Sequence, residues 1–548
     1  MTAAITATYA RARIGAAAAV AVNRRATLFT AVAALAGMTL AMFVATVLLT
    51  HGTFTYIIDD AYIHLTMARN VAFHGTWGMV PGEFESSSSS PGWVLFIGGL
   101  MRTVPALAEW LPFIVNAIAC IGILAVFARH QDVIAIRGRS AWRIAAVVLL
   151  PAVLFLPALI QLGMEHSLHT VLVLILLLQL ERMLRGQLSW RRITGFGVLL
   201  LVATALRLET AGLAVGCGVV LLAPQVINAM RRRSQTPNGR RRIVAAAVCG
   251  VAPAAVILAI GLVDVAHGQY FLPNSIVEKT HLLSSSILGA LIPDLGWMWT
   301  NLSSDPFMLA VMAVGVVAIV QGVRLRAVWV AWLIATIVQA TYAQFGWYER
   351  YQAYLLIAGV LLALRSAPEM RLFQVRSRQV IAVAALLLLL PLVKYWNIAG
   401  GPNAAANQFS QQHQMALFLS RYYDGKTVMV NDIGHVTWLH SGGLVDMWAL
   451  GSFDVLQAQR NGYYNATFMT ALAAQRHVAA VAEYSPSFDF LVPHGFVRVA
   501  SWHLRDAGDA RWQAIVFWAP AEGADAMRHD MRLFITTMPQ ERVTAQIY

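Results

Sequence analysis

The chain has 548 residues, of which 58% are hydrophobic and 12% are charged. Soluble globular domains carry about 25% charged residues, so this composition excludes an ordinary soluble protein and indicates a polytopic membrane protein. The formal net charge of +13 would suit nucleic acid only if the basic residues shared one face of a soluble module. They stand instead in short clusters between apolar segments, which is how membrane proteins encode orientation, so a lipid bilayer is expected and a nucleic-acid partner is not.

The first apolar segment predicts a span at residues 26–50, and the arginines before it predict a cytoplasmic N-terminus at residues 1–25. Further spans are predicted at residues 111–128, 144–162, 167–180, 193–206, 211–229, 243–263, 307–323, 327–345, 351–364 and 379–396, which makes eleven. This count leaves the arginine clusters on the cytoplasmic side and only single cations in the outer loops, namely Arg69, Arg102, Arg207, Lys279 and Arg350. We therefore expect a multi-pass domain at residues 26–396 of a cytoplasmic (inner) membrane, with a first outer loop at 51–110.

The first outer loop predicts two short helices. Residues 60–73 show apolar and polar positions at helical spacing and are followed by Gly75, so we expect a helix along the membrane surface. Residues 93–101 are too few to cross a hydrocarbon core about 30 Å thick, so this apolar piece is expected to be interfacial or re-entrant. The serine run at 86–90 predicts a flexible hydrophilic loop, which would also serve as a mobile flap.

After residue 396 the composition changes to that of a globular domain. Short strand-like runs occur at residues 427–430, 477–482, 496–500 and 513–518. About 150 residues can bury a core of their own, so residues 397–548 predict a small α/β domain. With an odd number of spans before it, this domain should be extracytoplasmic.

Asp59 and Asp60 stand where the first span gives way to the outer loop. An aspartate in this place is often only a helix cap. Two in a row at the outer mouth of a helical bundle favour a functional site, because such a carboxylate could take the proton from an acceptor hydroxyl or bind a cation that assists the reaction.

Isolated cations share the predicted outer face with this acid pair: Arg207, Lys279 and Arg350. Any one of them alone is better explained as a side chain that extends to the interface, but together they suit a phosphate or pyrophosphate at headgroup level. Other polar or aromatic candidates for substrate binding on this face are Arg69, Glu165, His166, Glu209, Trp93 and Tyr351. Aromatic rings there form an interfacial belt, and sugar rings stack on the same residue types.

Nine motifs in this order resemble the GT-C superfamily of polytopic glycosyltransferases, which take a sugar from a polyprenyl-phosphate carrier. They are IDDAYI at 58–63, ARN at 68–70, SSPGW at 89–93, GMEHS at 163–167, LRLET at 206–210, LPNSIVEKT at 272–280, ERY at 349–351, NDIGHVTW at 431–438 and LVDMWALGS at 444–452. Within the superfamily the chain is most similar to the branch that contains the arabinofuranosyltransferase AftB. The resemblance implies a GT-C fold of about eleven transmembrane helices.

The resemblance also implies roles for single residues. Asp59 becomes the catalytic base, and Asp60 orients it, shares its role or binds a divalent cation. The phosphate of the donor would lie on Arg207, Lys279 and Arg350, and the acceptor, a glycan, lipid or protein hydroxyl, would be bound through Asp432, Gly434 and Asp446. Relatives often carry Arg where Thr66 stands and Pro where Leu208 stands, so the donor contacts and the sugar can differ from theirs.

Two other classes of protein remain open at this stage. A transporter or flippase of lipid-linked sugars would carry charges near mid-span and repeat symmetry, neither of which the sequence shows. A membrane-anchored binding or scaffold protein would need fewer spans than eleven. No nucleotide-binding or hydrolase motif occurs in the chain, so a transfer that uses an already activated lipid-linked donor is favoured.

Overall fold

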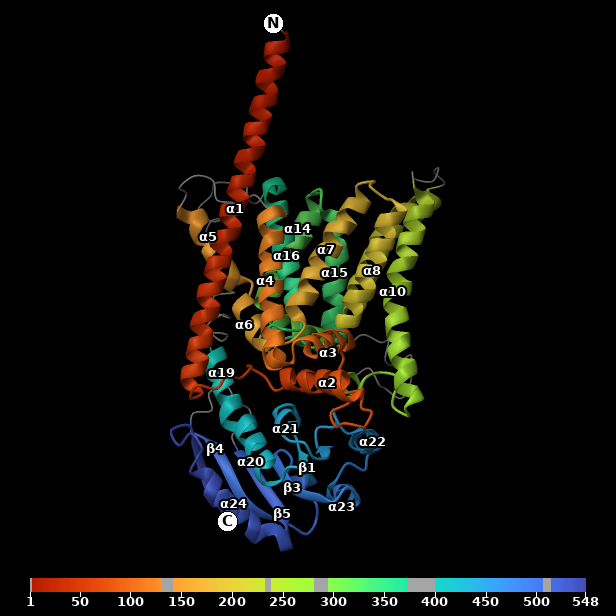
Figure 1. Cartoon of the computed structure of the whole chain (residues 1–548). Coiled ribbons are helices and arrows are strands. Elements are labelled where there is room, and N and C mark those ends of the chain that lie inside the picture. Colours follow the sequence, from red (N-terminus) through yellow and green to blue (C-terminus); the bar gives the residue numbers. More distant parts are fainter. Residues whose placement is uncertain (1, 131–140, 232–237, 280–293, 372–399, 506–513) are drawn as a thin grey trace.

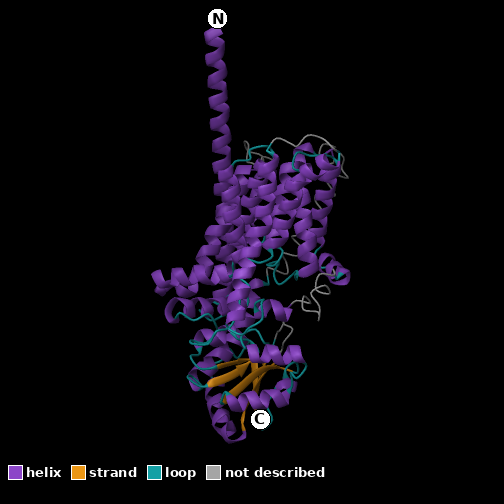
Figure 2. Cartoon of the chain, turned by 90° about the vertical axis from the view of Figure 1, so that its right-hand side faces the viewer, coloured by secondary structure: helices purple, strands orange, loops and turns teal. Residues whose placement is uncertain are grey.

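The computed structural model describes residues 2–130, 141–231, 238–279, 294–371, 400–505 and 514–548, and of residues 2–23, Trp142 and Lys279 it describes the backbone only. Long helices that run roughly side by side form a bundle, and a smaller domain with a β-sheet lies at one end of it (Figures 1 and 2). The predicted fold class, a helical membrane bundle with a C-terminal α/β domain, is confirmed.

The bundle helices are α1 (Thr2–Leu49), α4 (Leu111–His130), α5 (Ala141–Val153), α6 (Leu156–Leu162), α7 (His166–Leu184), α8 (Trp190–Leu206), α9 (Thr210–Met230), α10 (Gly239–Ala266), α14 (Pro306–Val320), α15 (Arg326–Tyr342) and α16 (Ala353–Ser366). In the part of the chain that the structure describes, six helices are long and apolar enough to cross a membrane. The number rises to seven if α13 (Leu295–Ser303) and α14, which meet at 102°, count as one span. Eleven spans therefore stay a prediction, and the last of them, 379–396, lies outside the described residues.

The predicted span at 144–162 is broken in two. Helix α5 ends at Val153, Phe155 adopts a left-handed backbone with φ of 56°, and α6 restarts at Leu156. Pro151 inside α5 and Pro157 at the start of α6 lack the backbone N–H that a continuous helix would use, which accounts for the break.

Helices α2 (Asp60–His74) and α3 (Pro91–Thr103) run across the end of the bundle rather than through it (Figure 1). Both were predicted as short outer helices, and Gly75 ends α2 in a left-handed conformation with φ of 65°. His64 and Asn70, two polar positions of this helix, are buried. Helix α2 is covered on both sides, by α3 and by the C-terminal domain.

The serine run is not a flexible loop. Ser86, Ser87, Ser88 and Ser90 are all buried. The hydroxyl of Ser86 donates to Asp264 of α10 at 2.9 Å, and its backbone carbonyl accepts from the amide of Asn274 at 2.8 Å. The neighbouring chain supplies enough partners to order a polar segment that the sequence alone would leave free.

The C-terminal domain consists of α19 (Gly401–Gln408), a π-helical turn (Phe409–His413), α20 (Gln414–Tyr422), β1 (Thr427–Val430), α21 (Gly434–Leu439), β2 (Leu444–Asp446), α22 (Phe453–Asn461), α23 (Ala466–Gln475), β3 (Val478–Ser485), β4 (Phe496–Leu504), β5 (Ala514–Pro520), α24 (Ala524–Ile535) and β6 (Val543–Ile547). The shorter helical pieces elsewhere are Pro105–Trp110, α11 (Asn274–Lys279), Ala367–Glu369, Asp489–Leu491 and Ala521–Gly523. All four predicted strands are confirmed within a few residues, and β2 and β6 were missed.

The six strands form one mixed sheet in the order β2-β1-β3-β5-β4-β6. Strand β1 pairs in parallel with β2 and β3, whereas β5 is antiparallel to β3 and β4, and β6 is antiparallel to β4. Asp432 follows the carboxyl end of β1, and Asp446 is the last residue of β2. The carboxyl ends of parallel strands are the usual place for ligands in such sheets, and here this edge faces α2.

The buried apolar side chains form two separate cores, and the boundary between them differs from the domain boundary expected from the sequence. One core is made by the long helices of the bundle. The second joins side chains of α2 and α3 to those of the α/β domain, among them Tyr62, Trp93 and Ile433. The first outer loop therefore packs with the C-terminal domain, although more than 300 residues separate them in the sequence.

Candidate active site

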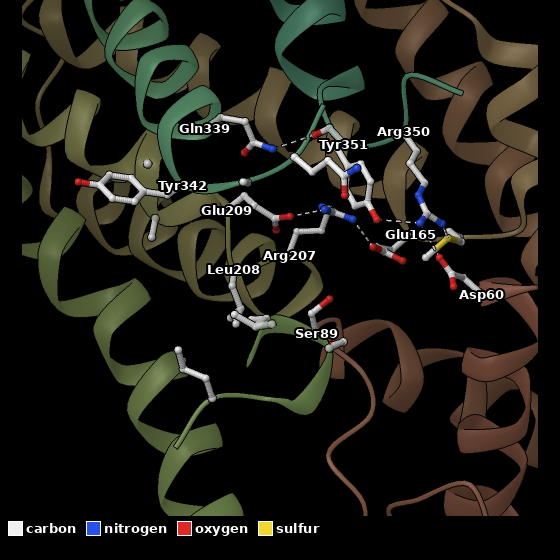
Figure 3. Close-up of a pocket in the computed structure, with 18 of the residues that line it drawn as sticks. Asp60, Ser89, Glu165, Arg207, Leu208, Glu209, Gln339, Tyr342, Arg350 and Tyr351 are labelled. Atoms are coloured by element: carbon white, nitrogen blue, oxygen red, sulfur yellow. Dashed lines mark hydrogen bonds and ion pairs between the residues drawn. The ribbon is translucent and has the colours of Figure 1, made fainter. Parts of the chain in front are cut away.

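A cavity of about 570 Å³ lies between the end of the bundle and the C-terminal domain. It is lined from α2, the serine run, the turn between α6 and α7, the turn between α8 and α9, helices α9, α10 and α15, residues 272–276, the turn before α16 and, from the C-terminal domain, Leu450. Among the predicted site residues, Asp60, Glu165, Arg207, Glu209, Arg350 and Tyr351 line it together (Figure 3). Sequence positions from 60 to 351 thus converge on one space.

Arg207 lies at the end of α8 and is 3% exposed. One terminal nitrogen contacts Glu165 at 2.6 Å and lies 3.1 Å from Nδ1 of His166, and the other nitrogen pairs with Glu209. His166 is buried behind this pair and is not among the residues that line the cavity. Arg207 is therefore held between two carboxylates and presents its guanidinium to the cavity (Figure 3).

Arg350 follows three consecutive residues in the left-handed conformation: Trp347, Tyr348 and Glu349, with φ of 49°, 62° and 62°. Side chains other than glycine rarely adopt this conformation, and such strain collects at functional sites. The turn is held by Gln352, whose amide donates to Asp305 at 3.0 Å and whose oxygen accepts from the backbone of Gly346. The hydrogen bonds of Gln352 thus stabilise a strained turn, and this turn sets the position of Arg350.

The guanidinium of Arg350 is 4% exposed at the side chain and makes three contacts. It pairs with Asp60 at 2.5 Å, donates to the hydroxyl of Tyr351 at 2.7 Å and lies 3.0 Å from the sulfur of Met164. Opposite charge raises the pKa of Arg350 above its usual range against the effect of burial, so it stays cationic.

Several polar atoms around the cavity have no hydrogen-bond partner among the described residues. They are Oε2 of Glu165, Nδ1 of His64 and Oγ of Ser87, all from buried side chains. The first two lie 3.7 Å from each other, within ion-pair distance but too far apart for a hydrogen bond. Buried polar groups nearly always make hydrogen bonds, so these atoms beside a cavity suit the hydroxyl groups of a bound molecule. His64 and Ser87 were not among the predicted site residues, although His64 follows Asp60 by four positions and so shares its helix face.

One part of the cavity lining is apolar and consists of Ile257 of α10, Leu272, Val338 of α15, and Ala211 and Gly212 of α9. Helix α15 also contributes the polar side chains of Gln339 and Tyr342. Both α10 and α15 are bundle helices (Figure 1), so the apolar part of the lining belongs to the bundle. The cavity can hold a ligand that is anionic and polar at one end and hydrocarbon at the other.

Asp59 is not among the residues that line this cavity. Its two carboxylate oxygens accept hydrogen bonds from the backbone amides of Gly434 at 2.6 Å and His435 at 2.9 Å, and one of them lies 2.8 Å from the ring Nδ1 of His435. Burial raises the pKa of Asp59, and the two amides oppose that rise. Asp59 and Asp60 are adjacent in sequence and yet serve different parts of the structure.

The remaining predicted residues whose side chains the structure describes do not line the cavity. Asp432 is still close enough to Asp59 and Asp60 that their like charge adds to the rise that burial causes in its pKa. Arg69 donates to the backbone carbonyls of Thr437 and Trp438, Trp93 is fully buried in α3, and Asp432 is bonded to Gln412 and Tyr484. Asp446 accepts from the backbone amides of Trp448, Leu450 and Gly451, which shapes the loop that brings Leu450 to the cavity. Lys279 ends α11, and its side chain lies outside the described part of the chain.

Metal binding at Asp60 stays a prediction. Within the described ranges, no group of three or more His, Cys, Asp and Glu side chains is arranged to hold a metal ion. The carboxylate of Asp60 is paired with Arg350 in this structure.

Comparisons with known proteins gave a family match within the C-terminal domain and matches to solved structures along most of the chain. A family described as "Domain of unknown function (DUF8728)" matches residues 398–528. The search of curated proteins found no match. Among solved structures, the oligosaccharyltransferase of Archaeoglobus fulgidus in the apo form is 12% identical, with 92% of this chain and 78% of that chain covered and a TM-score of 0.47.

Two further solved structures show similar values. ArnT from Cupriavidus metallidurans, bound to undecaprenyl phosphate, is 13% identical, with 89% of this chain and 98% of that chain covered and a TM-score of 0.46. The oligosaccharyltransferase AglB from Archaeoglobus fulgidus, in complex with an inhibitory peptide and a dolichol-phosphate, is 12% identical, with 90% and 77% covered and a TM-score of 0.43.

Proposed function

We propose that this protein is a GT-C glycosyltransferase that moves a sugar from a polyprenyl-phosphate donor to a hydroxyl of an extracytoplasmic glycan, lipid or protein. The observation that carries the proposal is one cavity lined by Asp60, Arg207 and Arg350 and backed by an apolar wall. Such a space matches the three parts of the donor: a sugar, a phosphate and a hydrocarbon chain. The ordered motifs of the sequence point to the same superfamily.

The chemistry follows from the pairs around the cavity. In the free protein Arg350 neutralises Asp60. A donor phosphate that enters would compete for Arg350, and the released carboxylate of Asp60 would become a stronger base. Asp60 then takes the proton of the acceptor hydroxyl while that oxygen bonds to the anomeric carbon and the bond from this carbon to the phosphate oxygen breaks. Arg350 and Arg207 stabilise the charge left on the lipid phosphate.

Asp60 is preferred here over Asp59, to which the motif resemblance gives the role of base. Asp60 lines the cavity, whereas the oxygens of Asp59 are occupied by the amides of α21. If the arginine-rich helix ends are cytoplasmic, as the cation pattern predicts, the cavity and the α/β domain lie on the outer side of a cytoplasmic membrane.

The test uses purified protein in detergent with radiolabelled polyprenyl-phosphate sugars, beginning with the arabinofuranose donor because of the resemblance to that branch. Wild type should transfer label from at least one donor, and Asp60→Asn should lower turnover about 10²- to 10⁴-fold. Asp525→Asn is the matched control, since that side chain is 99% exposed on α24. Undiminished turnover in Asp60→Asn would remove it as the base.

The same assay decides the metal question and the transporter alternative. EDTA should leave turnover unchanged if the two arginines supply all the charge that the phosphate needs, and a loss restored by a divalent cation would assign that cation to the site. If no donor turns over while lipid-linked sugar crosses the bilayer of reconstituted vesicles, the protein is a flippase.

A further inference from the structure

Helix α2 holds the short helix α21 at both ends. At the N-terminal end of α21, Asp59 accepts from the amides of Gly434 and His435. At the other end, Arg69 donates to the carbonyls of Thr437 at 2.7 Å and Trp438 at 2.8 Å. A helix of six residues leaves most of its terminal N–H and C=O groups without partners inside the helix, so these contacts satisfy groups that otherwise stay open. The carboxylate at the positive end and the guanidinium at the negative end also suit the helix dipole.

The two helices are in close contact between these ends. The hydroxyl of Thr437 lies 3.2 Å from that of Thr66, and the ring of Tyr62 lies 3.7 Å from the ring of His435, centroid to centroid. A Cβ atom on Gly434 would come within 2.2 Å of the backbone carbonyl oxygen of Asp59. The contact is thus specific in shape as well as in charge.

The position of α21 is linked to the cavity through the chain. Helix α21 connects β1 to β2, and the loop after β2 brings Leu450 to the cavity wall. The same loop is fixed to the bundle side by a hydrogen bond from the indole of Trp448 to Glu278 at 3.1 Å. A shift of α21 against α2 would therefore move one wall of the site.

We propose that Asp59 and Arg69 are positioning residues that fix the α/β domain over the cavity and so set how the acceptor is presented to Asp60. The effect of these two residues on turnover rests on the proposed function, whereas their contact with α21 does not. The adjacent aspartates then act on two sides of α2: Asp60 on the reacting groups, and Asp59 on the domain that completes the site.

The first test compares Asp59→Asn with Asp60→Asn in the full-length protein. The carboxamide of Asp59→Asn would turn an NH₂ group toward amide donors, so α21 should loosen. Hydrogen exchange followed by mass spectrometry should show amides 434–439 exchanging about 10-fold faster in Asp59→Asn and unchanged in Asp60→Asn. The KM for acceptor should rise about 10-fold in Asp59→Asn, while the affinity for undecaprenyl phosphate stays that of wild type.

The second test restores the contact without the carboxylate. Thr66→Cys with Thr437→Cys, oxidised by copper phenanthroline in the Asp59→Asn background, would link α2 to α21 covalently, since the two hydroxyl oxygens lie 3.2 Å apart. The three native cysteines are buried on the bundle helices α4, α9 and α10. Crosslinking should return the exchange rate and the acceptor KM toward wild type, and reduction should reverse both. Arg69→Ala should resemble Asp59→Asn, and combining the two should add little, since both hold one helix.

Two results would overturn the proposal. One is Asp59→Asn with α21 protected as in wild type and turnover lost. The other is a crosslinked Asp59→Asn protein with α21 protected and turnover still absent. Either would show that Asp59 acts on the substrate itself. A wild-type protein that turns over no donor would count against the proposed function instead, and the exchange data would still decide the contact.

Discussion

On the two sides of α2, aspartate and arginine side chains make different kinds of contact. On the cavity side, Asp60 pairs with Arg350, and Arg207 pairs with Glu165 and Glu209. On the other side, Asp59 and Arg69 bond to backbone groups of α21. Ion pairs between side chains can exchange a partner for a ligand, whereas bonds to the ends of a helix fix a position. The comparison separates charges that are available for chemistry from charges that hold the fold.

The divergence of two adjacent aspartates has a simple geometric cause. Asp60 is the first residue of α2 and Asp59 the residue before it. Successive side chains on a helix are about 100° apart, so neighbours at its start point in different directions. A helix covered on both faces can therefore offer one carboxylate to each of two cores.

After Asp60→Asn, the largest expected effect comes from removing a cation on the cavity side. Arg350→Ala should lower turnover about 10²- to 10³-fold, because a buried donor aimed at developing charge is lost and Asp60 remains without its partner. Affinity for undecaprenyl phosphate, measured by tryptophan fluorescence, should fall in parallel, and exchange of amides 434–439 should not change. If Arg350→Ala loosens α21 as much as Arg69→Ala does, the two sides of α2 are not independent.

A smaller effect is expected from crowding the contact between α2 and α21. Gly434→Ala would place a Cβ atom where the backbone of Asp59 lies, so α21 must move away. We expect faster exchange at 434–439, a several-fold rise in acceptor KM and unchanged donor affinity. Gly99→Ala on α3 is the matched control, because an added Cβ there meets nothing within 4 Å. Normal exchange in Gly434→Ala would mean that the contact tolerates displacement.

Periodicity and strand composition predicted the helices of the outer loop and four of the six strands. They missed β2, which has three residues, and β6, which has five and lies at the edge of the sheet. These strands form because neighbours are present to pair with them, which a local pattern does not contain. The same holds for the serine run, whose partners Asp264 and Asn274 are distant in sequence.

The site was predictable in part for a related reason. The single cations and acids of the outer loops pointed to one face, and the structure brings Arg207, Arg350, Glu165 and Glu209 together there. Sequence could not separate Asp59 from Asp60, since the difference depends on α21, almost 400 residues later. Nor could it assign Arg69 to a helix end, because a cation in an outer loop is equally suited to phosphate.

The smallest expected effect is on the pH dependence of thermal stability, in which the part due to the sheet can be separated from the part due to the contact between α2 and α21. Burial raises the pKa of Glu483, a residue of β3, to about 8, while its hydrogen bond from the indole of Trp518 lowers it. A raised carboxyl pKa means that the folded state holds the proton more tightly, so its contribution to stability is complete below about pH 4 and is lost as the pH rises toward 8. Glu483→Gln keeps an acceptor for Trp518 and removes this titration. The midpoint of thermal unfolding of wild type should therefore fall by about 3 °C more than that of Glu483→Gln between pH 6 and pH 8. If the midpoint falls equally with pH in wild type and in Glu483→Gln, Glu483 does not titrate in this range. A pH dependence of the midpoint that remains in Glu483→Gln but disappears when Asp59→Asn is added would belong to the contact between α2 and α21.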